Sequence, residues 1–157
     1  MDDIVIRKAV QQDCGPMLQL IKELADYEKA LHEVTLTLEQ FIEDGFGNSP
    51  VWGAFVAEHN GEILGISLYY DRYSTWKGRR LYLEDLVVTE KWRGKQIGKK
   101  LFEATMEYGK SCQYSGIVFQ VLNWNEPAIN FYKKYSPKFD NEWFNVSIEF
   151  KQDQNGN

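Results

Sequence analysis

Residues 84–98 read EDLVVTEKWRGKQIG and decide the fold of this chain. The apolar run 86–88 predicts a strand, 93–98 predicts a turn with two glycines, and the apolar residues that follow repeat at helical spacing. The first N–H groups of a helix have no partner within it and carry partial positive charge. Such a turn therefore predicts a phosphate site, with an ordinary connection as the alternative. Full positive charges come from Arg93, Lys95, Lys99 and Lys100.

A second stretch, residues 123–135, reads NWNEPAINFYKKY. The combination of R-G-x-x-I-G with W-N-E-P-A-I-N-F-Y resembles the GNAT family of acetyl-CoA-dependent N-acetyltransferases. The closer resemblance is to its diamine acetyltransferase branch, which covers spermidine/spermine and thialysine acetyltransferases. It extends over nearly the whole chain, through the motifs V-I-R-K-A, D-C-G-P-M-L-Q-L-I-K-E-L-A-D-Y-E-K, E-D-G-F-G, Y-S-T-W-K-G-R, L-Y-L-E-D and N-E-W-F.

The size and charge of the chain limit its class. A length of 157 residues predicts a single domain, here 1–150, followed by a polar tail, 151–157. Apolar residues make up 43% of the chain, which is enough for a sizeable core. The net charge of −5 argues against a nucleic-acid partner and suits a small cationic amine.

The cysteines and hydropathy indicate a cytoplasmic protein that does not enter membranes. Cys14 and Cys112 are far apart and lack the spacing of a metal site, so free thiols are the simplest interpretation. His32 and His59 also lack metal-ligand partners at a useful spacing, so no metal is expected. The chain contains no stretch of 18 apolar residues and no signal-peptide pattern.

The pattern of elements predicts an α/β protein. Asn60-Gly61 between two strand-like runs is a hairpin signal, and Gly109 is expected to end the helix that follows the phosphate turn. Strands are predicted near 4–10, 52–58, 63–70, 82–89, 116–122 and 144–150, and helices over 13–25, 37–45, 96–108 and 128–135. This order predicts a mixed sheet with helices on both faces. The resemblance implies a GNAT fold, whose mostly antiparallel sheet is splayed at its central strand.

The resemblance also implies the cofactor site. The backbone of the strand before the turn would pair with the pantetheine arm of acetyl-CoA, and the turn would hold its pyrophosphate. One departure is Gln96, which stands where the family has its first glycine; it either weakens the backbone approach to phosphate or adds an amide donor. The implied cofactor-binding residues are Leu86, Val87, Val88, Arg93, Gly94, Lys95, Gln96, Ile97, Gly98, Lys99, Asn125, Pro127, Ala128 and Tyr132.

Two residues match the family's catalytic positions. Tyr132 matches the tyrosine that protonates the departing thiolate, although a core tyrosine on a helix face is the alternative. Glu84 matches the residue that draws a proton from the amine through water, with a surface carboxylate as the alternative. Adjacent strand residues point to opposite faces, so Glu84 and Asp85 are not expected to form a carboxylate pair. Asn125 fits either a cofactor contact or a helix N-cap.

The acceptor is expected to be a small cationic amine held by carboxylates and aromatic rings. Polyamine-acetylating members carry an aspartate where this chain has Ser74, and the form Y-S-T-W-K-G-R looks like the thialysine-acetylating members. We therefore expect a thialysine-like or lysine-like acceptor, with polyamines as the alternative. The implied acceptor residues are Tyr27, Glu28, Ser74, Trp76, Glu84, Asp85 and Glu142.

Resemblance further implies a homodimer. A rival hypothesis from another class is a regulatory module that binds acetyl-CoA without turnover. Gln96 is the feature that favours the rival, whereas Tyr132, Glu84 and the charges of the turn favour catalysis.

Overall fold

The computed structural model describes residues 3–151 and divides the chain into two compact units, Met1–Gln120 and Val121–Asn157. Each unit is described by itself. Apart from Lys151, the expected polar tail lies outside the described residues. No helix within 3–151 is long and apolar enough to cross a membrane.

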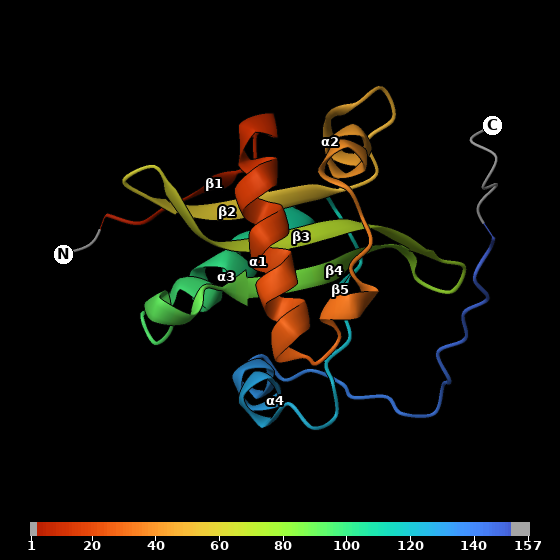
Figure 1. Cartoon of the computed structure of the whole chain (residues 1–157). Helices are drawn as coiled ribbons and strands as arrows, with labels where there is room; N and C mark the ends of the chain where they lie inside the picture. Colours follow the sequence, from red (N-terminus) through yellow and green to blue (C-terminus); the bar gives the residue numbers. More distant parts are fainter. Residues whose placement is uncertain (1–2, 152–157) are drawn as a thin grey trace. The chain divides into compact units, whose positions relative to one another are not determined.

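The first unit is built on a five-stranded mixed sheet (Figure 1). Its strands follow the order of the sequence, and neighbours pair antiparallel except for the last, parallel pair. They are β1 (Val5–Lys8), β2 (Gly53–His59), β3 (Glu62–Ser74), β4 (Gly78–Val88) and β5 (Ile117–Val118). The predicted hairpin at Asn60-Gly61 is confirmed, since both residues have the positive φ of a tight turn between β2 and β3.

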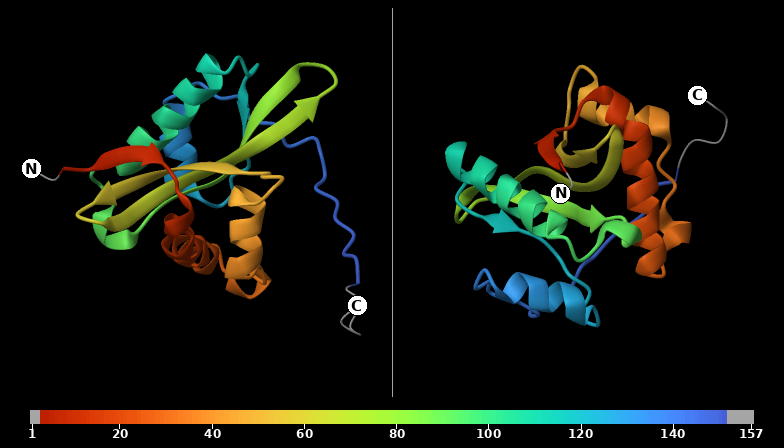
Figure 2. Two further views of the ribbon diagram at one scale, coloured as in Figure 1. Left: turned by 90° about the horizontal axis from the view of Figure 1, so that it is seen from above. Right: turned by 90° about the vertical axis from the view of Figure 1, so that its left-hand side faces the viewer.

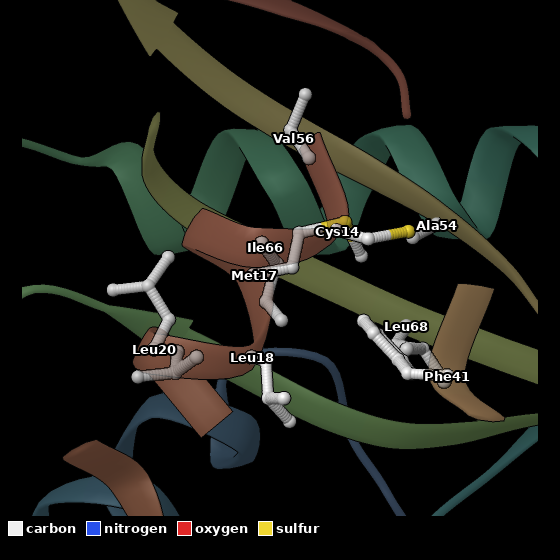
Figure 3. Packing of buried hydrophobic residues seen from close by; sticks show 10 residues of the cluster. Cys14, Met17, Leu18, Leu20, Phe41, Ala54, Val56, Ile66 and Leu68 are labelled. Carbon is white, nitrogen blue, oxygen red and sulfur yellow. The ribbon is translucent and has the colours of Figure 1, made fainter. Parts of the chain in front are cut away.

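Helices cover both faces of this sheet, as predicted (Figure 2). On one face, α1 (Cys14–Tyr27) and α2 (Leu38–Phe46) bury an apolar cluster that includes Met17, Phe41 and Ile66 (Figure 3). On the other face, α3 (Ile97–Ser111) packs through Leu101. A buried side chain of this size contributes roughly 1.5–3 kcal/mol to stability.

The ends of the helices differ in part from the prediction. Thr37 caps α2 at the start of the predicted helix, because its hydroxyl accepts a hydrogen bond from the Gln40 N–H. Asp13 precedes α1, but its carboxylate accepts from Arg7 and from the Val10 N–H and does not cap the helix. Gly109 was wrongly predicted to end α3, which continues to Ser111. Gly109 is buried within α3, and a Cβ there would meet a Leu81 methyl group at 3.4 Å, an ordinary van der Waals distance.

β3 continues beyond the strand predicted over 63–70, and β4 begins before the strand predicted over 82–89. β3 and β4 continue as a two-stranded hairpin to Ser74 and Gly78, and this hairpin extends past the helices that cover the sheet (Figure 1). Tyr73 and Trp76 at its end are 72% and 83% exposed.

The second unit contains one helix, α4 (Glu126–Lys133), among its described residues. Asn125 caps it by accepting a hydrogen bond from the Ala128 N–H, and Pro127 lies in its first turn. The predicted strand at 144–150 is wrong, because the segment has no regular structure. Its apolar side chains Phe144, Val146, Ile148 and Phe150 are 80–95% exposed, since no strand within 3–151 pairs with it.

Candidate active site

A bulge in β4 determines which side chains meet beneath α1 and α2. Leu68 pairs with Asp85 but the next residue, Tyr69, pairs with Leu83, so Glu84 is an extra residue in β4. The alternation of the strand reverses there. Leu81 lies against Gly109 of α3, whereas Val87, six positions later, packs on the opposite face with the α1 cluster.

This reversal corrects the prediction for the two carboxylates. Glu84 precedes the change of phase and Asp85 follows it, so both point to the α1 and α2 side. Both line a pocket of about 500 Å³. The period-2 alternation that separates adjacent residues holds only in a regular strand, and the extra residue breaks it.

The pocket combines apolar walls with acidic groups. Leu36, Val51 and Trp52 form part of the walls, and two more carboxylates, Glu33 and Asp44, lie along the lining. No lysine or arginine lines it. An acidic pocket of this kind suits an aliphatic chain that ends in an ammonium group.

A second hollow of about 900 Å³ lies between α1 and the turn that joins β2 to β3. Lys22 lies among its acidic residues, and neither Glu84 nor Asp85 reaches it. Despite its greater size, we therefore regard the smaller pocket at the bulge as the candidate acceptor site.

The two neighbouring carboxylates differ in their surroundings. Glu84 is exposed and accepts a hydrogen bond of 3.1 Å from the Tyr70 hydroxyl. Burial, helped by the negative charge of Glu84, raises the pKa of Tyr70 to about 12, so this hydroxyl remains a donor at neutral pH. Tyr70 was missed in the sequence, because nothing in its strand pattern distinguishes it from other tyrosines.

Asp85 is largely buried, and no donor within residues 3–151 reaches its carboxylate. Burial and the charges of Glu84 and Glu28 raise the pKa of Asp85 to about 7. Glu28 follows the end of α1, and burial raises the pKa of its carboxyl as well. The structure thus brings Glu28, Glu84 and Asp85 together.

The edge of β4 next to β5 is open beyond the bulge. β5 pairs with Leu81 and Tyr82 only, and no described strand continues this pairing along Leu86–Val88. The sheet is therefore splayed at β4, as expected. Backbone groups of Leu86 and Val87 on this side have no strand partner within residues 3–151, whereas the Val88 carbonyl accepts a hydrogen bond from Arg93 Nε.

The turn after β4 presents the N-terminus of α3. Gln96 precedes the helix with φ 68°, and no side chain caps the first N–H groups. Gln96 thus adopts the left-handed conformation that glycine favours, at a cost of roughly 1 kcal/mol. Gly94 has φ 80°, and a Cβ on Gly98 would approach only a Val88 methyl group, at 3.8 Å. The turn therefore leaves space for a ligand to approach its backbone.

The cations of the turn fall into two groups. Lys99 and Lys100 are exposed at the start of α3, with no partner within residues 3–151. Arg93 is instead engaged. Its Nε donates a hydrogen bond to the Val88 carbonyl at 2.9 Å, and its Cζ lies over the Tyr27 ring, 5.9 Å from the ring centroid. The unpaired lysines suit phosphate groups, whereas Arg93 supports the shape of the turn.

Glu23 of α1 holds the same turn from the other side. Its carboxylate accepts from the Thr89 hydroxyl and the Glu90 N–H, both at 3.0 Å, and lies 3.5 Å from Arg93. We call this group, Glu23 with Thr89, Glu90 and Arg93, the Glu23 clamp. The sequence carries no sign of it, because Glu23 follows a helical pattern shared with many surface residues.

Other predicted acceptor residues lie apart from the pocket. Ser74 closes the hairpin turn by accepting from the N–H groups of Trp76 and Lys77. Ser74 pairs with Gly78, which lies six residues before Glu84 in β4, a separation of roughly 20 Å along a strand. Tyr27 is 43% exposed at the end of α1.

The second unit holds the remaining predicted residues. Tyr132 is buried on α4, one helical turn after Ala128, and its burial raises its pKa. Asn125, also buried, is the N-cap of that helix, and Glu142 is exposed. Across both units, residues 3–151 hold no group of three His, Cys, Asp or Glu side chains suited to a metal ion.

Comparison with known proteins agrees with this arrangement. The sequence profile of the acetyltransferase (GNAT) family matches residues 16–136. Thialysine N-epsilon-acetyltransferase of Bos taurus is 41% identical over 83% of this chain and 81% of its own length. Spermidine/spermine N(1)-acetyltransferase-like protein 1 of Homo sapiens is 36% identical over 84% of this chain and 20% of its own length. A possible acetyltransferase from Clostridium difficile 630 shares the fold, with a TM-score of 0.77 and 17% identity over 94% of this chain and 99% of that one.

Proposed function

The chain belongs to the acetyltransferase (GNAT) family, and we propose that it transfers an acetyl group from acetyl-CoA to the side-chain amine of thialysine or a similar lysine-like amino acid. The observation that carries the proposal is the bulge in β4, which places two carboxylates in a pocket on one side of the strand and leaves its backbone edge free next to β5. The family and its named relatives make the chain an N-acetyltransferase, which disfavours the non-catalytic rival.

The chain offers a fitting site for acetyl-CoA. The free edge at Leu86, Val87 and Val88 is suited to the amide groups of pantetheine, and the N-terminus of α3 to the pyrophosphate. Bound acetyl-CoA would supply the thioester that is to be aminolysed. The residues assigned to the turn are Arg93, Gly94, Lys95, Gln96, Ile97, Gly98 and Lys99.

Two side chains are assigned to proton transfer. Glu84 draws a proton from the acceptor ammonium, and the support is its place in the pocket and its hydrogen bond from Tyr70. Tyr132 donates a proton to the departing thiolate. Burial raises the pKa of Tyr132, so the phenol is protonated at neutral pH, and its proton passes to a thiolate that is desolvated as well. No metal takes part in the proposal.

The acceptor assignment is supported by the relatives and by the hairpin. The thialysine N-epsilon-acetyltransferases of Bos taurus and Sus scrofa are 41% and 40% identical to this chain. Ser74 supplies no negative charge at the end of the hairpin, which lies roughly 20 Å from Glu84. A carboxylate there would attract only an acceptor long enough to reach it from the pocket. Polyamines are the second candidate, favoured by the four carboxylates of the pocket and by the human relative.

Release of coenzyme A with a panel of amines tests the proposal. We expect the highest kcat/KM with thialysine, followed by lysine and ornithine, and the lowest with spermidine and spermine. A parent that prefers spermine would overturn the acceptor assignment.

We further propose that the enzyme is a cytoplasmic homodimer. The dimer is supported by the exposed apolar side chains of residues 143–150, which alternate as in a strand with one buried face. The cytoplasmic location is supported by the two free cysteines, of which Cys112 is exposed.

A further inference from the structure

The proposed function gives the inner carboxylate of the pocket, Asp85, no part in proton transfer. Asp85 lines the same pocket as Glu84 because of the bulge, it is the more deeply buried of the two, and no donor within residues 3–151 pairs with it. A largely buried carboxylate without a partner is costly for the fold. Its position therefore calls for a partner that arrives with the substrate.

We propose that Glu84 and Asp85 act as one proton-accepting pair, in which Glu84 meets the acceptor ammonium and Asp85 holds the proton taken from it. The inference rests on the proposed function of this pocket and deepens it, since the proton acceptor becomes the pair and not Glu84 alone. Both carboxylates line one pocket and the charge of Glu84 acts on Asp85, and neighbouring carboxylates of this kind favour a single proton between them.

The charges around the pair favour one shared proton. Glu28 at the end of α1 acts on Asp85 with the same sign as Glu84, and Glu33 and Asp44 of the α1–α2 side line the pocket. From the sheet, Tyr70 donates to Glu84, and Tyr82 lies close enough for both carboxylates to raise its pKa. Arg72 acts on these two tyrosines and does not line the pocket. No cation therefore compensates the pair until the acceptor binds.

The step is balanced. One N–H bond of the ammonium breaks and one O–H bond forms on the pair, while the electron pair stays on nitrogen, which becomes the neutral nucleophile. The proton passes from Glu84, the exposed member, to Asp85, the buried one, and leaves to water after turnover. Burial and the neighbouring charges raise the pKa of Asp85 to about 7, close to the value that suits a base at neutral pH.

Infrared spectroscopy of the free enzyme tests the proton's location without mutation of the pair. Protein labelled with 13C-aspartate should show the carbonyl stretch of a protonated aspartate at pH 6, and this band should disappear by pH 8.5. The band should be absent from Asp85→Asn and present in Glu39→Gln, a control that removes one carboxylate from the exposed surface of α2. A band that is insensitive to 13C-aspartate, or that persists in Asp85→Asn, overturns the proposal.

Kinetics test whether the two residues work as a unit. Asp85→Asn should lower kcat/KM by about 10²-fold at neutral pH and remove the acidic limb of its pH profile, as expected for a lost base. Glu84→Gln should lower kcat/KM to a similar extent. The kcat/KM of the double variant should lie within threefold of that of the less active single variant, because the effects of residues that act as one unit are not additive. Asp85→Glu should recover part of the activity.

The outcomes separate the two levels of the proposal. If the parent releases no coenzyme A with any amine, the proposed function fails, while the infrared titration still decides where the proton lies. If the parent is active and the single effects multiply in the double variant, Glu84 and Asp85 act independently and the pair is refuted. If Asp85→Asn does not fold, the labelled parent alone decides.

Discussion

The side-chain direction of Asp85 is determined by the bulge at its neighbour Glu84. In a regular strand it would lie on the opposite face from Glu84, and the extra residue at position 84 places both in one pocket. Alternation predicted the strand correctly, but it carries no sign of a bulge, which depends on pairing with β3. The identity of both carboxylates as site candidates followed from resemblance, whereas their proximity required the structure.

The raised pKa of Asp85 has a consequence for stability. An aspartate in the unfolded chain has a pKa of about 3.9, and in the folded protein the pKa rises to about 7. Between these values the folded state binds more protons, so this contribution to stability is lost as the pH rises through 7. Asp85→Asn removes the effect. Its stability advantage over the parent should be larger at pH 8 than at pH 5, by roughly 1–3 kcal/mol.

Urea unfolding of parent and Asp85→Asn at both pH values measures this difference. Glu39→Gln is the control, because its exposed side chain should give nearly equal shifts at pH 5 and pH 8. A difference between Asp85→Asn and the parent that does not change with pH would mean that Asp85 titrates normally in the folded protein.

Tyr132 carries the prediction for acid catalysis. Tyr132→Phe keeps the ring and removes the hydroxyl, so kcat should fall by roughly 10²-fold while the affinity for acetyl-CoA changes little. Steady-state kinetics and calorimetry measure the two quantities. Tyr135→Phe, a tyrosine just beyond α4, is the matched control. Parental turnover in Tyr132→Phe would assign Tyr132 to packing.

Among the elements, the turn before α3 was well predicted, but the end of α3 was not. The glycines, the basic residues and the apolar spacing indicated both the turn and the helix, and Ile97 begins α3 one residue after the expected start. Glycine is a stop signal in many helices, but Gly109 is buried within α3, which continues to Ser111. Sequence alone does not distinguish a glycine that ends a helix from one inside it.

Cofactor binding is predicted to depend on the backbone at Gly98. Gly98→Val should raise the dissociation constant of acetyl-CoA about tenfold or more, because a lost backbone contact to a charged group is worth roughly 1.5–3 kcal/mol. The variant should fold, since the nearest atom to a Cβ there is a methyl group at 3.8 Å. Calorimetry measures the affinity, and Gly15→Val in α1, which also meets no clash, is the control. Unchanged affinity in folded Gly98→Val would contradict the site.

At the scale of the whole molecule, the mixed sheet with helices on both faces and the hairpin at Asn60-Gly61 follow from patterns in the sequence, whereas the GNAT arrangement of the strands followed from the resemblance. The segment 144–150 shows the limit of that approach. Its alternation predicts a strand, but a strand needs a partner, and none within residues 3–151 pairs with it. The local sequence indicates that a segment can form a strand, but it does not indicate which strand pairs with it.

The proposed homodimer makes a prediction for this segment. Phe144→Ser combined with Ile148→Ser removes two apolar side chains that are 95% and 80% exposed. The free energy of unfolding of a single chain should therefore change little. If the segment is covered in a dimer, the double variant should raise the dissociation constant of the dimer at least tenfold. The loss of buried apolar area costs about 1.5–3 kcal/mol per side chain. Sedimentation measures this, with Asn145→Ser as control. A parent that is monomeric, or a variant dimer of parental strength, would contradict it.

The Glu23 clamp bears on how the two substrates influence each other. Glu23 joins α1, whose Leu18 and Ile21 line the acceptor pocket, to the turn that is proposed to bind pyrophosphate. A ligand that tightens the turn therefore also restrains the wall of the pocket, and thermodynamic reciprocity requires the acceptor to favour cofactor binding by the same factor. Such coupling is typically 5–150-fold. We expect coenzyme A to strengthen acceptor binding at least fivefold in the parent, and Glu23→Gln, but not Glu39→Gln, to reduce this ratio towards one. An equal ratio in the parent and Glu23→Gln would show that the coupling does not pass through Glu23, whereas the expected loss would trace the mutual strengthening of the two substrates to a single carboxylate on α1.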